Sequence, residues 1–126
     1  MQVPESDYRV FVVDDEHMIT WTLAEILRKK GYDAMPFTHP AEALKEAGNS
    51  PPDLLISDQV MPLMSGVELA RKVLQICPHC KVLILSGQAA TSELIEFAGP
   101  PGTTFGVVPK PVHPEELLRR IRALSR

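Results

Sequence analysis

Short apolar runs recur along this chain, and they constrain its fold more than any other feature. They lie at residues 10–13, 54–56, 82–85 and 107–108 and are rich in β-branched residues. None of them alternates apolar with polar residues, which is the pattern of strands that are buried on both faces of a parallel sheet. Because helices cover both faces of such a sheet, the runs predict an α/β fold.

Segments with helical periodicity separate the runs. We expect strands at residues 9–14, 32–37, 54–57, 81–85 and 105–108. We expect helices at residues 16–30, from a capping Thr38 to about residue 47, from Ser65 or Gly66 onward, at residues 91–98 and at residues 114–124. Gly31 should end the first helix and Gly48 should follow the second, because glycine is favoured just past a helix C-terminus.

Five strand–helix units with short connections are typical of a doubly wound α/β sheet. We therefore predict a five-stranded parallel sheet in the order 2-1-3-4-5, with helices on both faces in the flavodoxin-like three-layer arrangement. A single domain should occupy residues 1–126, with its core at residues 8–125 and no room for a second domain.

Composition narrows the class of protein. The chain has 126 residues, of which 44% are hydrophobic and 23% charged, as in soluble globular proteins. A net charge of −3 predicts no nucleic-acid partner. No apolar run approaches the roughly 20 residues of a membrane span. The first nine residues carry Glu5 and Asp7 and no apolar core, unlike a signal peptide, so we expect a cytoplasmic protein without membrane contact.

Five polar residues lie at or just past the ends of the predicted strands: Asp14, Asp15, Asp58, Ser86 and Lys110. Ligands of doubly wound sheets bind beyond the carboxyl ends of the strands, so these side chains should converge. Three clustered carboxylates repel one another and need a cation or a shared proton. Oxygen ligands favour Mg²⁺, and the serine and lysine add a hydroxyl donor and a positive charge. Together they predict a receptor for a phosphoryl group carried on an aspartate.

Four stretches resemble the motifs of response-regulator receiver domains, and the resemblance covers essentially the whole chain. They are Val-Val-Asp-Asp-Glu at 12–16, Asp-Gln-Val-Met-Pro-Leu-Met-Ser-Gly at 58–66, Leu-Ser-Gly at 85–87 and Lys-Pro at 110–111. The second is the most specific, because Asp followed by Met-Pro-x-Met-x-Gly is rare outside the family. The resemblance also implies a cis bond between Lys110 and Pro111.

The resemblance assigns a role to each candidate residue. Asp58 would be the phosphoacceptor, and Ser86 and Lys110 would contact the phosphoryl oxygens. Mg²⁺, or Mn²⁺ in its place, would be held by Asp14, Asp15, Asp58 and the backbone carbonyl of Val60.

The resemblance also implies partners. The donor would be a histidine kinase or a phosphotransfer protein, and a downstream protein would bind the face formed by the fourth helix, the fifth strand and the fifth helix. The chain would not be an enzyme, since it would catalyse only its own phosphorylation and dephosphorylation, and it would carry no output domain.

Departures from the family pattern keep a second hypothesis open. The family usually has an aromatic residue three positions before the lysine, where this chain has Val107; Phe105 lies two residues earlier. The segment Gly-Pro-Pro-Gly at 99–102 and Pro109 on the predicted edge strand are also unusual. The chain could therefore be a docking module that is not phosphorylated.

The sequence gives less support to two further hypotheses, a phosphatase and a functional pair of cysteines. An aspartyl-phosphate phosphatase of the haloacid dehalogenase type needs Asp-x-Asp at the first strand, whereas Asp14 and Asp15 are adjacent. Cys77 and Cys80 form a Cys-x-x-Cys motif, but it follows a helix instead of starting one, so the helix dipole would not lower the thiol pKa. We expect neither redox nor metal chemistry from these cysteines.

Overall fold

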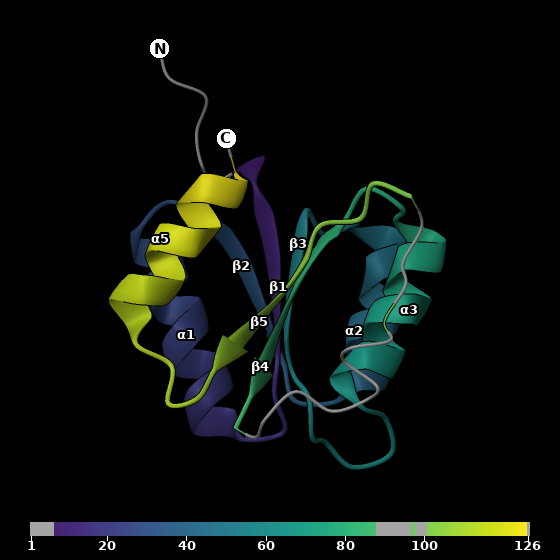
Figure 1. Ribbon diagram of the computed structural model, residues 1–126, viewed down its shortest axis with the longest axis horizontal. Coiled ribbons are helices and arrows are strands. Elements are labelled where there is room, and N and C mark those ends of the chain that lie inside the picture. Colours follow the sequence, from purple (N-terminus) through teal and green to yellow (C-terminus); the bar gives the residue numbers. More distant parts are fainter. Residues whose placement is uncertain (1–6, 88–96, 98–100, 126) are drawn as a thin grey trace.

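Five parallel strands form a single twisted sheet in the computed structural model, which describes residues 7–87, 97 and 101–125 (Figure 1). The strands are β1 (Arg9–Val13), β2 (Asp33–Phe37), β3 (Leu54–Asp58), β4 (Lys81–Ser86) and β5 (Phe105–Pro109). Their order is β2-β1-β3-β4-β5, and every neighbouring pair is parallel. The predicted topology is confirmed.

Helices cover both faces of the sheet. Helices α1 (His17–Lys29) and α5 (Pro114–Leu124) lie on one face, and α2 (Pro40–Asn49) and α3 (Gly66–Ile76) lie on the other (Figure 1). The helix expected at residues 91–98 lies outside the described residues, apart from Phe97. None of the helices within the described ranges is long and apolar enough to cross a membrane.

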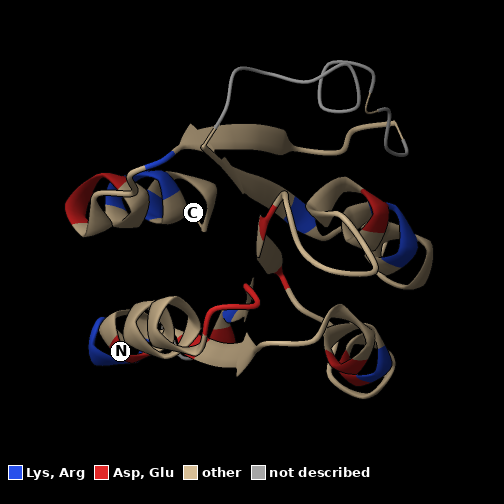
Figure 2. Cartoon of the chain, turned by 90° about the horizontal axis from the view of Figure 1, so that it is seen from below, with Lys and Arg blue, Asp and Glu red and all other residues tan. Residues whose placement is uncertain are grey.

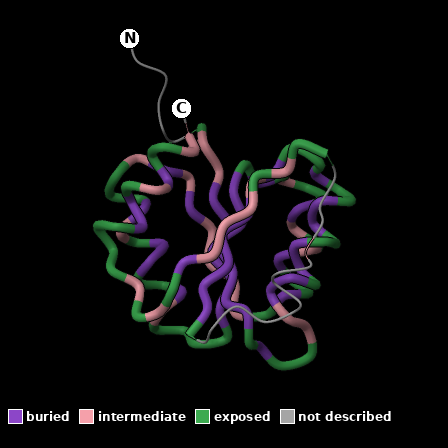
Figure 3. Tube along the Cα trace, in the orientation of Figure 1, coloured by how far each residue is buried: buried purple, intermediate pink, exposed green. Residues whose placement is uncertain are grey.

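The sheet divides the core in two, which explains why its strands are apolar without alternation. Side chains of neighbouring strand residues point to opposite faces. Phe11 thus packs with Leu55 and Val73 on the α2–α3 side, whereas the adjacent Val12 packs with Leu27 on the α1–α5 side. In Figure 3 the inner strands β1, β3 and β4 are almost entirely buried, whereas the edge strands β2 and β5 are mostly of intermediate burial.

Two predicted boundaries of the second helix are wrong, and proline explains both. His39, not Thr38, precedes the helix, because a residue before proline favours the extended conformation and His39 has φ −125° and ψ 120°. The helix also continues through Gly48 to Asn49. It ends where Ser50, with φ −139° and ψ 80°, leaves the helical conformation ahead of Pro51.

Other helix ends agree with the sequence. Ser65 precedes α3 and forms a capping box: its hydroxyl accepts from the Glu68 amide, and the Glu68 carboxylate accepts from the Ser65 amide. Gly31 follows α1 with φ +97°, a left-handed conformation that glycine adopts without strain.

The direction of the backbone groups in the edge strand β5 explains why a proline is tolerated at position 109. The Thr104 carbonyl accepts from β4, and the Lys110 amide donates to β4. Since the backbone groups of alternate residues point the same way, those of Val107 and Pro109 point away from the sheet. Pro109 therefore costs the sheet no hydrogen bond. Arg120 of α5 donates to the outward Val107 carbonyl at 3.1 Å.

Candidate functional site

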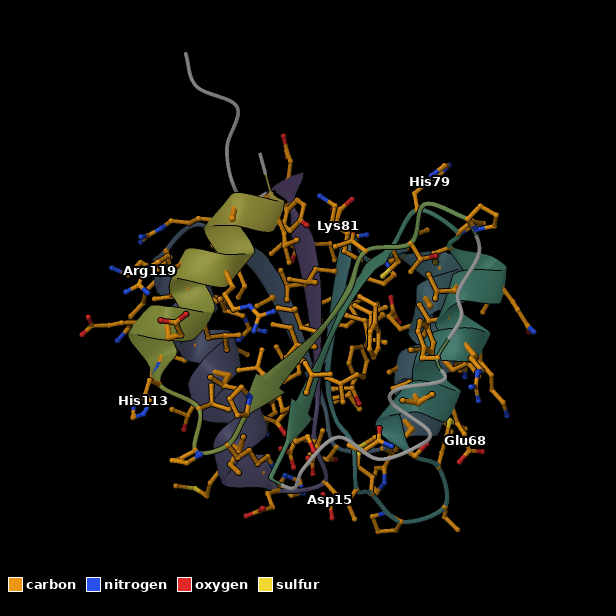
Figure 4. All side chains as sticks on the ribbon, viewed as in Figure 1. Asp15, Glu68, His79, Lys81, His113 and Arg119 are labelled. Carbon is orange, nitrogen blue, oxygen red and sulfur yellow. The ribbon has the colours of Figure 1, made fainter. Side chains whose placement is uncertain are left out.

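Three carboxylates meet at the carboxyl edge of the sheet. Asp14 and Asp15 directly follow β1, and Asp58 is the last residue of β3. One oxygen of each lies within 4.8 Å of the others, and among the described residues these three form the one such group of potential metal ligands. Asp14 and Asp58 are buried and Asp15 is exposed. Figure 2 views the molecule from this edge, and Figure 4 labels Asp15 there.

The environment of Asp14 opposes its negative charge. Burial raises the pKa of Asp14 to about 6, and the nearby charges of Asp58 and Asp15 act in the same direction. A hydrogen bond from the Glu16 amide to Oδ1, 3.0 Å long, and the charge of Lys110 act in the opposite direction. The other oxygen, Oδ2, is buried and has no hydrogen-bond partner among the described residues. A bound cation would supply that partner.

Lys110 neutralises part of the acidic cluster. Its Nζ lies 2.9 Å from Oδ1 of Asp58. Burial by itself lowers the pKa of Lys110, but the hydrogen bond to Asp58 and the attraction of the surrounding carboxylates outweigh it, so the pKa is raised. Its ammonium is therefore charged at neutral pH. One ammonium against three carboxylates leaves an excess of negative charge that suits a divalent cation.

Ser86 and Lys110 are placed together by the backbone. Ser86 is the last residue of β4 and is buried, and its carbonyl accepts a 2.9 Å hydrogen bond from the Lys110 amide. The Lys110–Pro111 bond is cis, as predicted. The expected phosphoryl-contacting residues therefore lie at the carboxyl ends of two adjacent strands, at the same edge as the three aspartates.

The loop between β3 and α3 lies against the site and is closely packed at its base. A Cβ on Gly66 would lie 2.4 Å from the Asp58 carbonyl oxygen, so no larger residue fits there. Leu63 has φ +72° and is fully exposed, and Val60 exposes 72% of its surface. No sequence pattern singled out Gln59, which is buried at the start of this loop and is bonded to the far end of the loop and to β4. A polar residue directly after a buried strand was the only available signal.

Phe105 lies on the same side of the sheet as Val107, but far from Ser86. Both β5 residues pack against the α2–α3 side of the core. The ring of Phe97 stacks on that of Phe105 with centroids 4.4 Å apart, and the Arg71 guanidinium lies 5.8 Å from the Phe97 centroid. In the register of β4 and β5, Phe105 pairs with Val82, which lies four residues before Ser86. Phe105 is therefore roughly 13 Å from Ser86 along the strand direction.

The two cysteines lie at the opposite end of the sheet from the acidic cluster. Both are buried free thiols in the turn between α3 and β4. Burial raises the pKa of both, that of Cys80 to about 12. The reactive thiolate is thus disfavoured at neutral pH.

Comparison with known proteins agrees with this arrangement. The family model described as "Response regulator receiver domain" matches residues 10–122. The receiver protein CpdR of Brucella abortus (strain 2308) is 31% identical over 116 residues, which cover 92% of this chain and 95% of CpdR. The response regulator MprA of Mycobacterium leprae (strain TN) is 33% identical over 118 residues, or 94% of this chain. The chain spans about half the length of MprA, 51%.

Solved structures show the same fold. A CheY-like receiver domain protein from Methanospirillum hungatei JF-1 superposes with a TM-score of 0.82 at 28% identity, covering 93% of this chain and 92% of that one. The chemotaxis protein CheY4 of Vibrio cholerae gives a TM-score of 0.79 at 28% identity, covering 92% and 97%. From its acidic edge, its sheet order and these matches, the chain belongs to the family of response-regulator receiver domains.

Proposed function

We propose that this receiver accepts a phosphoryl group onto the carboxylate of Asp58 in a reaction that depends on Mg²⁺ or Mn²⁺. The donor would be the phosphohistidine of a histidine kinase or phosphotransfer protein, and the reaction would take place in the cytoplasm. The observation that carries the proposal is the position of Asp58, which is 2.9 Å from Lys110 and within 4.8 Å of two further carboxylates.

The residues present fit a divalent cation. Asp14, Asp15, Asp58 and the Val60 carbonyl would be the protein ligands, an oxygen-only set of the kind that Mg²⁺ prefers. The buried Oδ2 of Asp14, which lacks a hydrogen-bond partner among the described residues, supports this assignment. When bound, Mg²⁺ would offset the negative charge of the carboxylates and of the incoming phosphoryl group.

The chain's own residues account for the transfer. A carboxylate oxygen of Asp58 forms the new bond to phosphorus as the bond from phosphorus to the donor's imidazole nitrogen breaks. The imidazole leaves with that electron pair and is then protonated. Lys110, which is charged at neutral pH, stabilises the negative charge on the phosphoryl oxygens, and the Ser86 hydroxyl donates to one of them. The chain thus acts as a self-modifying switch rather than as an enzyme with turnover.

Intact-mass measurement with acetyl phosphate and Mg²⁺ tests the proposal. We expect one added phosphate in the wild type, none in Asp58→Asn and none when EDTA removes the divalent metal. Phosphate that persists in Asp58→Asn would overturn the assignment of the phosphoacceptor.

A docking module that is not phosphorylated is the second candidate, and Val107 favours it, because a valine cannot act as the rotating aromatic of the family. Beryllofluoride, which mimics the phosphoryl group on a carboxylate, separates the two. Mg²⁺-dependent binding of beryllofluoride supports the receiver, and its absence in a protein that binds Mg²⁺ supports the docking module. Membership of the receiver family leaves no support for the haloacid dehalogenase hypothesis.

A downstream protein would bind the face that includes β5 and α5. On α5, Arg119 is exposed and pairs with Glu116 within the same helix. The fourth helix of the expected face lies outside the described residues.

A further inference from the structure

A buried glutamine separates the proposed phosphoacceptor from the proposed carbonyl ligand. Gln59 follows Asp58 and precedes Val60, and it exposes only 5% of its surface. Burying an amide side chain costs free energy unless its polar atoms are hydrogen-bonded. A glutamine in this position therefore implies a specific set of contacts, and the structure provides them.

Gln59 ties the two ends of the β3–α3 loop together. Its side-chain Oε1 accepts a 3.1 Å hydrogen bond from the Val67 amide, and its carbonyl accepts a 3.0 Å bond from the Gly66 amide. Its own amide donates to the Leu85 carbonyl of β4 at 3.0 Å. One residue thus connects β4, the end of β3 and the start of α3.

These bonds occupy amides that a helix leaves without internal partners. The first amides of a helix cannot bond within it. In α3 the amides of Gly66 and Val67 donate to Gln59, and the amide of Glu68 donates to the Ser65 hydroxyl. Figure 4 shows Glu68 at the same end of the molecule as Asp15. The start of α3 is therefore anchored beside the acidic cluster.

The conformation of the loop beyond Gln59 is only partly fixed by the loop's own packing. Val60 and Leu63 are exposed, and Leu63 has a positive φ that a leucine adopts only at a cost. Met61 is buried and contacts the α2–α3 side of the core. Met64 is partly buried and packs against the same side. Without the bonds of Gln59, the stretch that begins at Val60 would be fixed mainly by these two methionine side chains.

We propose that Gln59 is a positioning residue for the metal site: its side chain fixes the loop so that the Asp58 carboxylate and the Val60 carbonyl face Mg²⁺ together. The inference rests on the proposed function, because it concerns the same site. Groups that hold metal ligands from outside the coordination sphere typically change metal affinity by about 10–100-fold when they are removed.

The test compares two variants that each remove a side-chain acceptor from an amide at the start of α3. Gln59→Met keeps the side-chain length and removes the acceptor for the Val67 amide. Ser65→Ala removes the acceptor for the neighbouring Glu68 amide and leaves the Gln59 bonds intact. Titration calorimetry measures Mg²⁺ affinity, and thermal unfolding without metal measures stability.

Both variants should lower the unfolding temperature, but only Gln59→Met should weaken Mg²⁺ binding, by about tenfold or more. The Mg²⁺ concentration that half-saturates phosphorylation by acetyl phosphate should rise in parallel. Equal losses of affinity in the two variants, or a folded Gln59→Met with wild-type affinity, would overturn the proposal.

Gln59→Asn keeps the amide but shortens its reach by one methylene, and it decides the question if Gln59→Met does not fold. We expect weaker Mg²⁺ binding than in the wild type, and an unchanged affinity would overturn the inference. Measurements on the wild type distinguish a failure of the proposed function from a failure of the inference about Gln59. If it neither binds Mg²⁺ nor accepts phosphate at Asp58, the proposed function fails; if it does both and the Gln59 variants match it, only the inference about Gln59 fails.

Discussion

Asp14 is a residue whose negative charge opposes folding in the metal-free protein. It is buried beside two other carboxylates, and one of its oxygens has no hydrogen-bond partner among the described residues. Its pKa of about 6 lies above the value of 3.8 that is usual for an unfolded chain. The free energy of unfolding that the neutral Asp14 carboxyl contributes below about pH 4 is therefore lost as the pH rises through 6. The cause is that the folded state resists ionisation of this carboxyl.

Asp14→Asn should stabilise the metal-free protein at pH 7.5 by about 2 kcal/mol and leave it nearly unchanged at pH 4. Near pH 7.5 the substitution removes a buried charge, whereas near pH 4 the folded wild type is already neutral at this position. Urea unfolding in EDTA at the two pH values measures the difference. Equal stability of the two proteins at pH 7.5 would contradict the electrostatic account.

Leu63 is a second residue at which the metal-free protein is under strain. The Met64 amide donates to the Pro62 carbonyl at 2.8 Å, which closes a γ-turn around Leu63. A γ-turn with positive φ at its centre is rare and strained. The side chain is fully exposed, so no burial compensates for the strain.

Leu63→Asn should raise the free energy of unfolding by about 0.5–1 kcal/mol, because asparagine tolerates a positive φ better than leucine does. Val60→Asn is the matched control, since Val60 is an exposed apolar residue of the same loop without a positive φ. Chemical denaturation of both variants would decide the matter. A gain in Val60→Asn as large as that in Leu63→Asn would mean that loss of an exposed apolar group, not strain, is the cause.

At the scale of elements, the turn between α3 and β4 is separate from the chemistry at the other end of the sheet. Cys77 directly follows α3, and Cys80 precedes β4. The Cys80 amide bonds back to the Cys77 carbonyl at 3.0 Å, and the Cys77 thiol contacts the Ala47 carbonyl at 3.7 Å. These contacts are those of a packed turn.

The double variant Cys77→Ser, Cys80→Ser should fold and accept phosphate at a rate close to that of the wild type. In the wild type, both thiols should react slowly with an alkylating reagent until urea unfolds the chain, because burial disfavours their thiolates. Mass spectrometry follows both reactions. Zinc in the purified protein, or a large loss of phosphorylation in the double variant, would show that the cysteines have a function.

At the scale of the whole molecule, the proposed metal binding at the acidic edge would be coupled to global stability. A ligand that binds only the folded state stabilises it by mass action, by about 2.7 kcal/mol at a hundred times its dissociation constant. The proposed ligands come from the ends of β1 and β3, which are hydrogen-bonded neighbours in the middle of the sheet. Binding should therefore protect the entire domain from unfolding.

Mg²⁺ should raise the unfolding temperature of the wild type in proportion to the logarithm of its concentration, and Asp15→Ala should lose most of this effect. Asp15 is exposed, so its removal should change the stability of the metal-free protein little or raise it slightly by relieving repulsion. Calorimetry at several Mg²⁺ concentrations measures the slope. An Asp15→Ala protein with the wild-type slope would remove Asp15 from the set of ligands.

The sequence predicted the sheet and the residues at its edge, because both depend on local signals. Apolar runs mark strands, and the polar residue after each run marks its carboxyl end. The start of α2 was misplaced by one residue, since the restriction that Pro40 places on His39 outweighed the capping preference of Thr38. Gln59 was not found, because its partner Val67 is eight residues away and only the folded loop brings them together.

The arrangement at β5 also bears on whether another strand could pair with this edge of the sheet. An open sheet edge is a template for another strand, and such pairing leads to aggregation. On the outer side of β5, Pro109 offers no donor and the Val107 carbonyl is already bonded to Arg120. A further strand that paired with this edge would therefore lack some of the usual backbone hydrogen bonds. A protein that binds here would therefore have to recognise side chains instead of extending the sheet.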